Sequence, residues 1–164
     1  GPETMCQDEP SAAATMVGQN LGAGKPDRAE AAVWRAGWFN AAFYFLIGVI
    51  FWLFSHGIIG IFTVEPEVLR YGTSALHIIA YGFAFYGLGM VLETAFNGAG
   101  DTRTPTYLNL LIFWIFEIPL AYVLAYHFGL GPDGVFWAIP LAFSLLAIAS
   151  GLLFKRGRWK EKVV

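Results

Sequence analysis

Four long stretches of apolar residues, separated by short segments rich in glycine, proline and charged residues, dominate the sequence. They cover residues 32–54, 71–97, 105–128 and 135–154. A helix needs about 20 apolar residues to cross the roughly 30 Å of hydrocarbon in a bilayer. Each stretch reaches that length, and few charged residues lie inside any of them. The pattern predicts an all-α integral membrane protein with four transmembrane helices.

Two further segments precede the first stretch. Residues 1–10 are polar and acidic and lack the basic start of a signal peptide, so we interpret them as a leader or tag-like segment. The small residues of 11–17 are too few to span a bilayer and are typical of the end of a preceding helix. In the loop that follows, Gly22 and Gly24 are suited to ending that helix, and Pro26 is suited to starting the next.

The composition agrees with burial in a lipid bilayer, which is the first partner that the sequence predicts. Hydrophobic residues make up 57% of the 164 residues, and charged residues make up 13%, about half the share in a soluble domain. The net charge of −2 argues against a nucleic-acid partner. The single cysteine, Cys6, excludes an intramolecular disulfide. The sequence contains no hydrolase triad, haem motif or phosphate-binding loop, so we expect no enzyme, no metal site and no cofactor.

Lysine and arginine residues predict how the helices are oriented. Four antiparallel spans place Arg70 on one side of the membrane and nine basic residues on the other. Basic residues collect on the cytoplasmic side of membrane proteins. We therefore place the loops 18–31 and 98–104 and the C-terminus in the cytoplasm. The nine residues are Lys25, Arg28, Arg35, Arg103, Lys155, Arg156, Arg158, Lys160 and Lys162.

Most of the six tryptophans lie near the ends of the predicted spans. Amphipathic indole rings favour the interface between membrane and water. We therefore expect an aromatic belt made by Trp34, Trp38, Trp52, Trp137 and Trp159.

Glu93 lies about one turn inside the cytoplasmic end of the second stretch. A charged carboxylate is costly in lipid, so it should face protein or a water-filled cavity and is a candidate for function. Tyr86 and Met90 share its helical face at spacings of seven and three, and Asn97 lies one turn further on. Two interpretations remain open. Glu93 either lines a transport pathway, or it reaches the interface or pairs with Arg103.

Glu117 lies near the middle of the third stretch, about twelve residues from each end. At that depth the carboxyl group must be neutral, paired or hydrated in a cavity. Pro119, two residues later, frees a backbone carbonyl that could help to line a polar site. The open alternatives are a functional acid and a structural hydrogen bond between helices.

Uncharged polar residues mark two further positions. His77 forms a stripe with Thr73 and Tyr81 at four-residue spacing, which we expect to face other helices or a wet cavity. Asn40, inside the first stretch, favours a hydrogen bond between helices over a ligand contact. Close contact between helices is expected at the glycines of the second stretch, Gly82, Gly87 and Gly89.

Three segments together resemble the multidrug and toxic compound extrusion (MATE) family. ATMVGQNLGAGKPDRAEAA is similar to the loop between the second and third helices of a six-helix lobe in that family. ETAFNGAGDTRTPTYLNL resembles the junction between the fourth and fifth helices of the lobe, and IPLAYVLAYHFGLGPDGVFWAIP resembles its fifth and sixth helices. The resemblance runs over residues 11–162 and covers nearly all of the chain.

The resemblance implies a partial C-terminal lobe of a twelve-helix efflux antiporter in the inner membrane of a bacterium or archaeon. The expected partners are the N-terminal lobe of the same transporter and small cationic, amphipathic substrates, with sodium ions or protons as the coupling ion. The alternative is a non-transporting membrane fragment or a structural assembly partner.

The resemblance does not assign the coupling residue. In some branches an acid in the fourth helix of this lobe binds the coupling cation, and Tyr86 stands at the matching position here. Glu93 and Glu117 therefore remain physical inferences. The candidate residues of the substrate or cation pathway are Glu117, Glu93, Tyr86, Asn97, His77 and Asn40.

Overall fold

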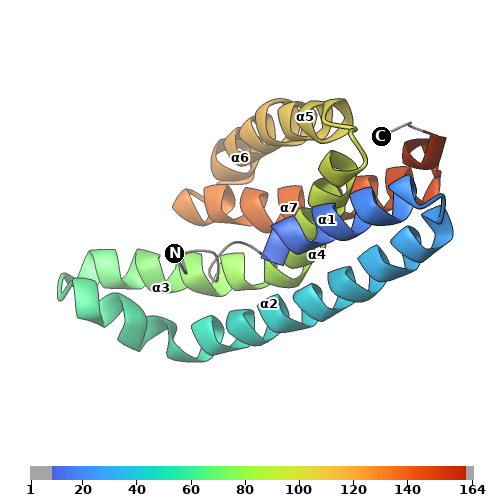
Figure 1. Ribbon diagram of the computed structural model, residues 1–164. Helices are drawn as coiled ribbons and strands as arrows, with labels where there is room; N and C mark the ends of the chain where they lie inside the picture. Colours follow the sequence, from blue (N-terminus) through green and yellow to red (C-terminus); the bar gives the residue numbers. More distant parts are fainter. Residues whose placement is uncertain (1–8, 162–164) are drawn as a thin grey trace, which may run out of the picture.

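The computed structural model describes residues 9–161, and the regular structure within this range is helical throughout (Figure 1). Cys6 and most of the predicted leader lie outside the described residues. The predicted leader, residues 1–10, overlaps the first helix, because Glu9 and Pro10 already belong to that helix.

The described elements follow one another as helices joined by short turns (Figure 1). Three helical stretches are long and apolar enough to cross a membrane, and there are four if α3 and α4 count as one bent span. The chain is therefore an all-α membrane protein. The elements are α1 (Glu9–Gly22), α2 (Pro26–Phe62), α3 (Pro66–Ala80), α4 (Phe83–Gly98), α5 (Arg103–Asn109), η1 (Leu110–Glu117), α6 (Ile118–Tyr122), η2 (Val123–His127), α7 (Pro132–Lys155) and η3 (Arg158–Glu161).

Helix α2 is longer than the predicted span 32–54. It begins at Pro26, as the loop chemistry predicts, but it continues to Phe62, eight residues beyond the end of that span. Gly57 and Gly60 lower the stability of a helix in this extension. The extension also provides a packing surface, because a Cβ atom on Gly72 of α3 would lie 3.0 Å from the Ile59 side chain. Contact with α3 therefore outweighs the local preference for a turn.

The second predicted span, 71–97, is divided into α3 and α4, which meet at a bend of 54°. The regular ladder of hydrogen bonds is interrupted where Tyr81 and Gly82 donate to carbonyls three residues earlier. Two other helices approach this bend closely. A Cβ atom on Gly82 would lie 2.8 Å from Pro140 of α7, and one on Gly48 of α2 would lie 2.9 Å from the Ala80 carbonyl oxygen. Glycine at the bend is therefore required by close packing.

The third predicted span, 105–128, begins earlier and winds more loosely than expected. It starts at Arg103, and Asp101 stabilises its first turn by accepting a hydrogen bond from the Thr104 hydroxyl at 2.7 Å. Two π-helical segments, η1 and η2, interrupt the α-helix. Pro119 is the second residue after η1. It lacks an N–H and its ring crowds the preceding turn, which favours an irregular winding there.

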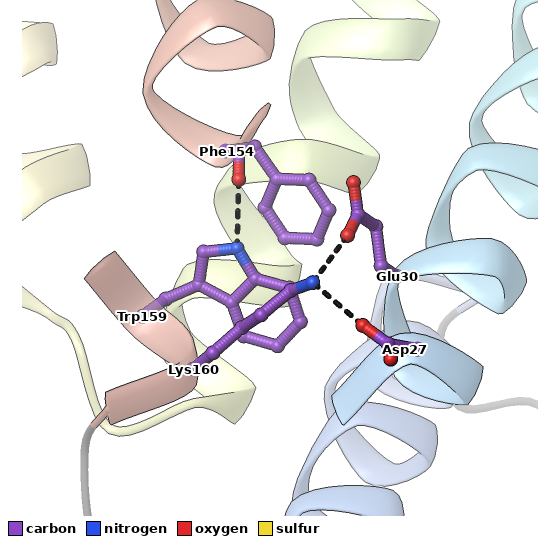
Figure 2. Close-up of polar contacts among 5 residues, drawn as sticks. All are labelled: Asp27, Glu30, Phe154, Trp159 and Lys160. Carbon is purple, nitrogen blue, oxygen red and sulfur yellow. Dashed lines mark hydrogen bonds and ion pairs between the residues drawn. The ribbon is translucent and has the colours of Figure 1, made fainter. Parts of the chain in front are cut away.

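The C-terminal turn η3 packs back onto the start of α2 (Figure 2). Trp159 is only 1% exposed, stacks on Phe154 at 4.6 Å and donates its indole N–H to the Phe154 carbonyl at 2.8 Å. The prediction that Trp159 belongs to an interfacial belt is therefore wrong. Lys160 Nζ lies 2.6 Å from Glu30 Oε2 and 3.0 Å from Asp27 Oδ1, and these contacts raise the pKa of Lys160. The last and first long helices are thereby tied together at one end of the bundle.

Helix α1 packs on α4 at a point where only glycine fits. A Cβ atom on Gly98 would fall against the backbone of Ala14. Replacing Gly98 by alanine should therefore separate α1 from α4 and destabilise the fold by about 1–3 kcal/mol, as overpacking does in other proteins. The matched control is Gly57→Ala, because Gly57 has nothing within 4 Å of the added atom. Unfolding of the purified protein in mixed micelles measures both variants, and equal stabilities for the two would contradict this packing.

Candidate functional site

Helices α4 and α7 pack side by side and run in the same direction. Each contact joins residues that are 57 or 58 positions apart in the sequence. On the α4 side, the contact residues are spaced by four, three and seven positions, which fits the seven-residue period of parallel helices that share one seam. The contacts of this α4–α7 seam are Gly82 with Pro140, Tyr86 with Phe143, Gly89 with Leu146, and Phe96 with Phe154.

Glu93 lies on this seam, four residues after Gly89 and three before Phe96. It is half-buried, and its Oε1 atom is buried without a hydrogen-bond partner. The side-chain amide of Asn109, at the end of α5, interacts with the same carboxyl group. Within residues 9–161 the ion pairs are those of Lys160, so Glu93 does not pair with Arg103. The alternative of a charge pair for Glu93 is therefore wrong.

Glu117 lies at the end of η1 and is half-buried. Phe113, one turn earlier in the same segment, contacts Phe143 of α7 at 6.2 Å between ring centres. Among the described side chains none forms a hydrogen bond or ion pair with Glu117, so the alternative of a structural bond between helices is not supported. Glu117 thus stands one turn beyond a ring that packs on α7.

Tyr86 lies at the centre of an aromatic cluster that joins α2, α4, α7 and η1. Its ring centre is 4.9 Å from that of Phe143 and 5.5 Å from that of Tyr44. Phe113 continues the cluster through Phe143. Glu93 lies two turns from Tyr86 along α4, and Glu117 lies one turn from Phe113 along the third span. We call Tyr44, Tyr86, Phe113 and Phe143 the aromatic cluster, and the two acids flank it.

His77 and its stripe make structural contacts away from this cluster. The Nε2 atom of His77 lies 2.7 Å from the Ser55 hydroxyl and 2.9 Å from the Trp52 carbonyl oxygen. These bonds fasten α3 to α2. Tyr81 stacks on Trp137 of α7 at 5.9 Å, so two members of the stripe face other helices as predicted. Thr73 instead donates to a carbonyl of its own helix.

Neither Asn40 nor Asn97 forms a hydrogen bond with a side chain of the aromatic cluster. Asn40 Nδ2 donates to the Gly87 carbonyl at 2.9 Å, which is a hydrogen bond between α2 and α4. The side chain of Asn97 is exposed. The predicted close contacts are confirmed at Gly82 and Gly87, where an added Cβ atom would lie 2.8 Å from a neighbouring helix, whereas at Gly89 the nearest atom, of Leu146, would lie at an ordinary 3.6 Å. Of the six candidates, Tyr86 belongs to the aromatic cluster, and Glu93 and Glu117 lie within two turns of its members along their own helices.

The sequence reasoning missed two polar residues of this region, Asn109 and Ser150. Asn109 faces Glu93 from α5. Ser150 is fully buried in α7, and its hydroxyl has no hydrogen-bond partner. Both are uncharged residues inside apolar stretches, so a search for buried charge passes over them. The available signal is spacing, because Ser150 follows Phe143 by the same seven residues that separate Glu93 from Tyr86. Within the described range, no three His, Cys, Asp or Glu side chains gather as a metal-binding group.

Comparison with known proteins gives a consistent match. The family model MatE matches residues 10–123. The probable multidrug resistance protein YpnP of Bacillus subtilis is 30% identical over 146 residues, covering 89% of this chain and 32% of that protein. The probable multidrug resistance protein NorM of Pseudomonas aeruginosa is 32% identical over 149 residues, which cover 88% of this chain and 30% of that protein. Protein DETOXIFICATION 14 of Arabidopsis thaliana is 28% identical over 152 residues, which cover 93% of this chain and 31% of that protein. The chain spans about a third of the length of these relatives.

The contacts of Asn40 generate a test of its structural role. Replacing Asn40 by alanine removes the bond to the Gly87 carbonyl and should lower stability by about 0.6 kcal/mol, the average for such bonds in membrane proteins. Replacing the exposed Asn97 by alanine should leave stability unchanged. Unfolding in mixed micelles compares the two, and an equal loss in both variants would remove Asn40 from its assigned role.

Proposed function

The chain belongs to the MatE family, and on that basis we propose that it forms part of a multidrug efflux antiporter. Relatives that match over most of the chain are named multidrug resistance proteins, and proteins of this family are transporters rather than enzymes. The chain spans about a third of their length. We therefore propose that further helices, including an N-terminal lobe, complete the transporter.

We propose that the exported compounds are cationic and amphipathic. The support comes from the two acids that flank the aromatic cluster. Carboxylates inside a membrane protein attract positive charge, and aromatic faces bind organic cations while burying their apolar parts. Tyr86 and Phe143 supply such faces where α4 meets α7.

We propose that inward flow of sodium ions or protons drives export. Alternating access requires two lobes that move around a shared site, so this activity belongs to the complete transporter. The bend between α3 and α4 fits such movement, because interrupted helices are common at the working sites of transporters.

The proposed location is the plasma membrane, namely the inner membrane of a bacterium or archaeon, with the C-terminus in the cytoplasm. The α1–α2 turn and the C-terminal turn lie at the same end of the bundle, opposite the α2–α3 turn (Figure 1). Most of the lysines and arginines therefore gather at one end, as the positive-inside rule requires for a cytoplasmic face.

The observation that carries this proposal is the position of Glu93 and Glu117 on either side of the aromatic cluster, in a chain that matches MatE. Replacing either acid by glutamine in the full-length transporter keeps the size of the side chain and removes its charge. Each change should lower efflux of a cationic dye from loaded cells by tenfold or more, measured at equal protein levels.

Glu67→Gln is the matched control. Glu67 is an exposed acid in the first turn of α3, far along the chain from the aromatic cluster, and its replacement should leave efflux unchanged. Unchanged drug resistance and unchanged cation dependence in both Glu93→Gln and Glu117→Gln would overturn the proposed role of these acids.

A further inference from the structure

An apolar groove runs between α2 and α7, over α4, which packs against both of them. Its volume is about 280 Å³. The three helices meet at Gly151 of α7, where an added Cβ atom would lie 3.6 Å from the Trp34 ring of α2 and 3.8 Å from Leu92 of α4. Glycine at this position leaves the groove open, because a longer side chain would fill it.

The groove is apolar along its length and carries a positive charge at one end. Lys155, the last residue of α7, lines it, and the other lining residues are glycine or apolar. Along α7, Ile148, Leu152 and Lys155 follow one another at spacings of four and three, so they share one face of the helix. The side chains of Ile148 and Leu152 are 56% and 61% exposed. An apolar strip that is open to its surroundings thus ends at an ammonium group.

The charge of Lys155 is available for a partner from outside the chain. At this end of the bundle, Lys160 takes both acids of the first turns of α2, Asp27 at 3.0 Å and Glu30 at 2.6 Å (Figure 2). Among the side chains that the structure describes, no acid lies within 4 Å of Lys155. The groove therefore ends at a cation that has no counter-ion of its own.

The length of the groove matches one leaflet of a bilayer. Its lining on α7 covers residues 147–155, which rise by about 12 Å at 1.5 Å per residue. One leaflet contributes about 15 Å of hydrocarbon, half of the total thickness. Trp34 lines the same groove, and indole rings favour the interface between membrane and water. An acyl chain laid along the groove would bring its headgroup to Lys155.

We propose that this groove binds one anionic phospholipid from the leaflet at the basic end of the bundle. One acyl chain lies along Leu88, Gly151 and Leu152, and the phosphate group pairs with Lys155. Lysines near a membrane surface attract anionic lipids, and basic pockets between transmembrane helices bind lipid headgroups. The inference requires that the helices span a membrane, but it does not depend on the proposed efflux of drugs.

A transmembrane helix is the rival occupant, and the structure favours the lipid. Helix α1 packs elsewhere, because Ala12 and Ala13 line a separate hollow with Phe39 and Val91. The groove is too small to enclose a helix, whose diameter with side chains is about 10–12 Å. A helix that covered the groove would also bury Lys155, and a charge buried in a membrane is costly unless the helix brings an acid.

The test counts lipids bound to the purified full-length transporter by native mass spectrometry. The protein, in a neutral detergent, is titrated with phosphatidylglycerol or with phosphatidylcholine of the same acyl chains. The first lipid should bind as phosphatidylglycerol with an affinity about fivefold higher, the effect of one lysine on an anionic lipid. Lys155→Gln should remove this preference and leave phosphatidylcholine binding unchanged. Gly151→Leu fills the groove and should weaken the binding of both lipids.

Matched controls separate the groove from general effects of charge and packing. Lys25 is an exposed lysine of the α1–α2 turn, at the same end of the bundle, and it does not line the groove. Lys25→Gln should bind phosphatidylglycerol as the wild type does. Gly151→Ala adds an atom at an ordinary contact distance and should keep most of the binding. If Gly151→Leu fails to fold, Ile148→Trp fills the groove from an exposed position instead.

The outcomes separate the lipid from its rivals. Equal affinity for the two lipids, or an equal loss in Lys155→Gln and Lys25→Gln, overturns the proposal. Glycerol phosphate that displaces the lipid as well as an intact phospholipid does would make this a site for a free anion and overturns it too. If the groove-filling variants retain as much lipid as the wild type, a helix of the transporter covers the groove and the proposal fails. None of these results depends on drug export.

Discussion

Close packing of α4 against α7 is the constraint on which the rest of this bundle depends. Lipid tails are as apolar as leucine, so helices in a membrane associate through van der Waals contact at small residues. Gly82 and Gly89 allow that contact along the seam. The other helices attach to this pair: α1 at Gly98, α2 at Gly87, and the third span along α7. Larger residues at these points would push the helices apart and separate the polar groups between them.

The same packing sorts the polar side chains into two groups. One group forms hydrogen bonds that hold helices together: Asn40 bonds to the Gly87 carbonyl, and His77 bonds to the Ser55 hydroxyl and the Trp52 carbonyl. The other group is buried or half-buried and less well satisfied: Glu93 Oε1 and the Ser150 hydroxyl have no hydrogen-bond partner, and no described side chain bonds to Glu117. Because unpaired polar groups are costly in a membrane, the second group marks the candidate functional site.

Much of the fold could be predicted from the sequence, because the length of an apolar run and the chemistry of a turn are local properties. The apolar runs, the helix start at Pro26 and the glycine contacts are of this kind. The bend at Tyr81 and Gly82 could not be predicted, because its cause is the approach of Pro140 from a distant helix. The burial of Trp159 likewise depends on contact with Phe154. The site was half predictable: burying a charge makes Glu93 conspicuous, whereas Asn109 is recognised as its neighbour only once the chain has folded.

The α4–α7 seam can be tested most directly by disulfide crosslinking of the full-length transporter after Cys6→Ser removes the cysteine of this chain. A disulfide forms readily when two Cβ atoms lie about 3.5–4.5 Å apart and point toward each other. Gly89→Cys with Leu146→Cys reports the known contact of the seam. The seam predicts that this pair crosslinks and that Gly89→Cys with Ile148→Cys does not, because the Ile148 side chain is exposed. Crosslinking of the Ile148 pair in place of the Leu146 pair would contradict the packing of α4 on α7.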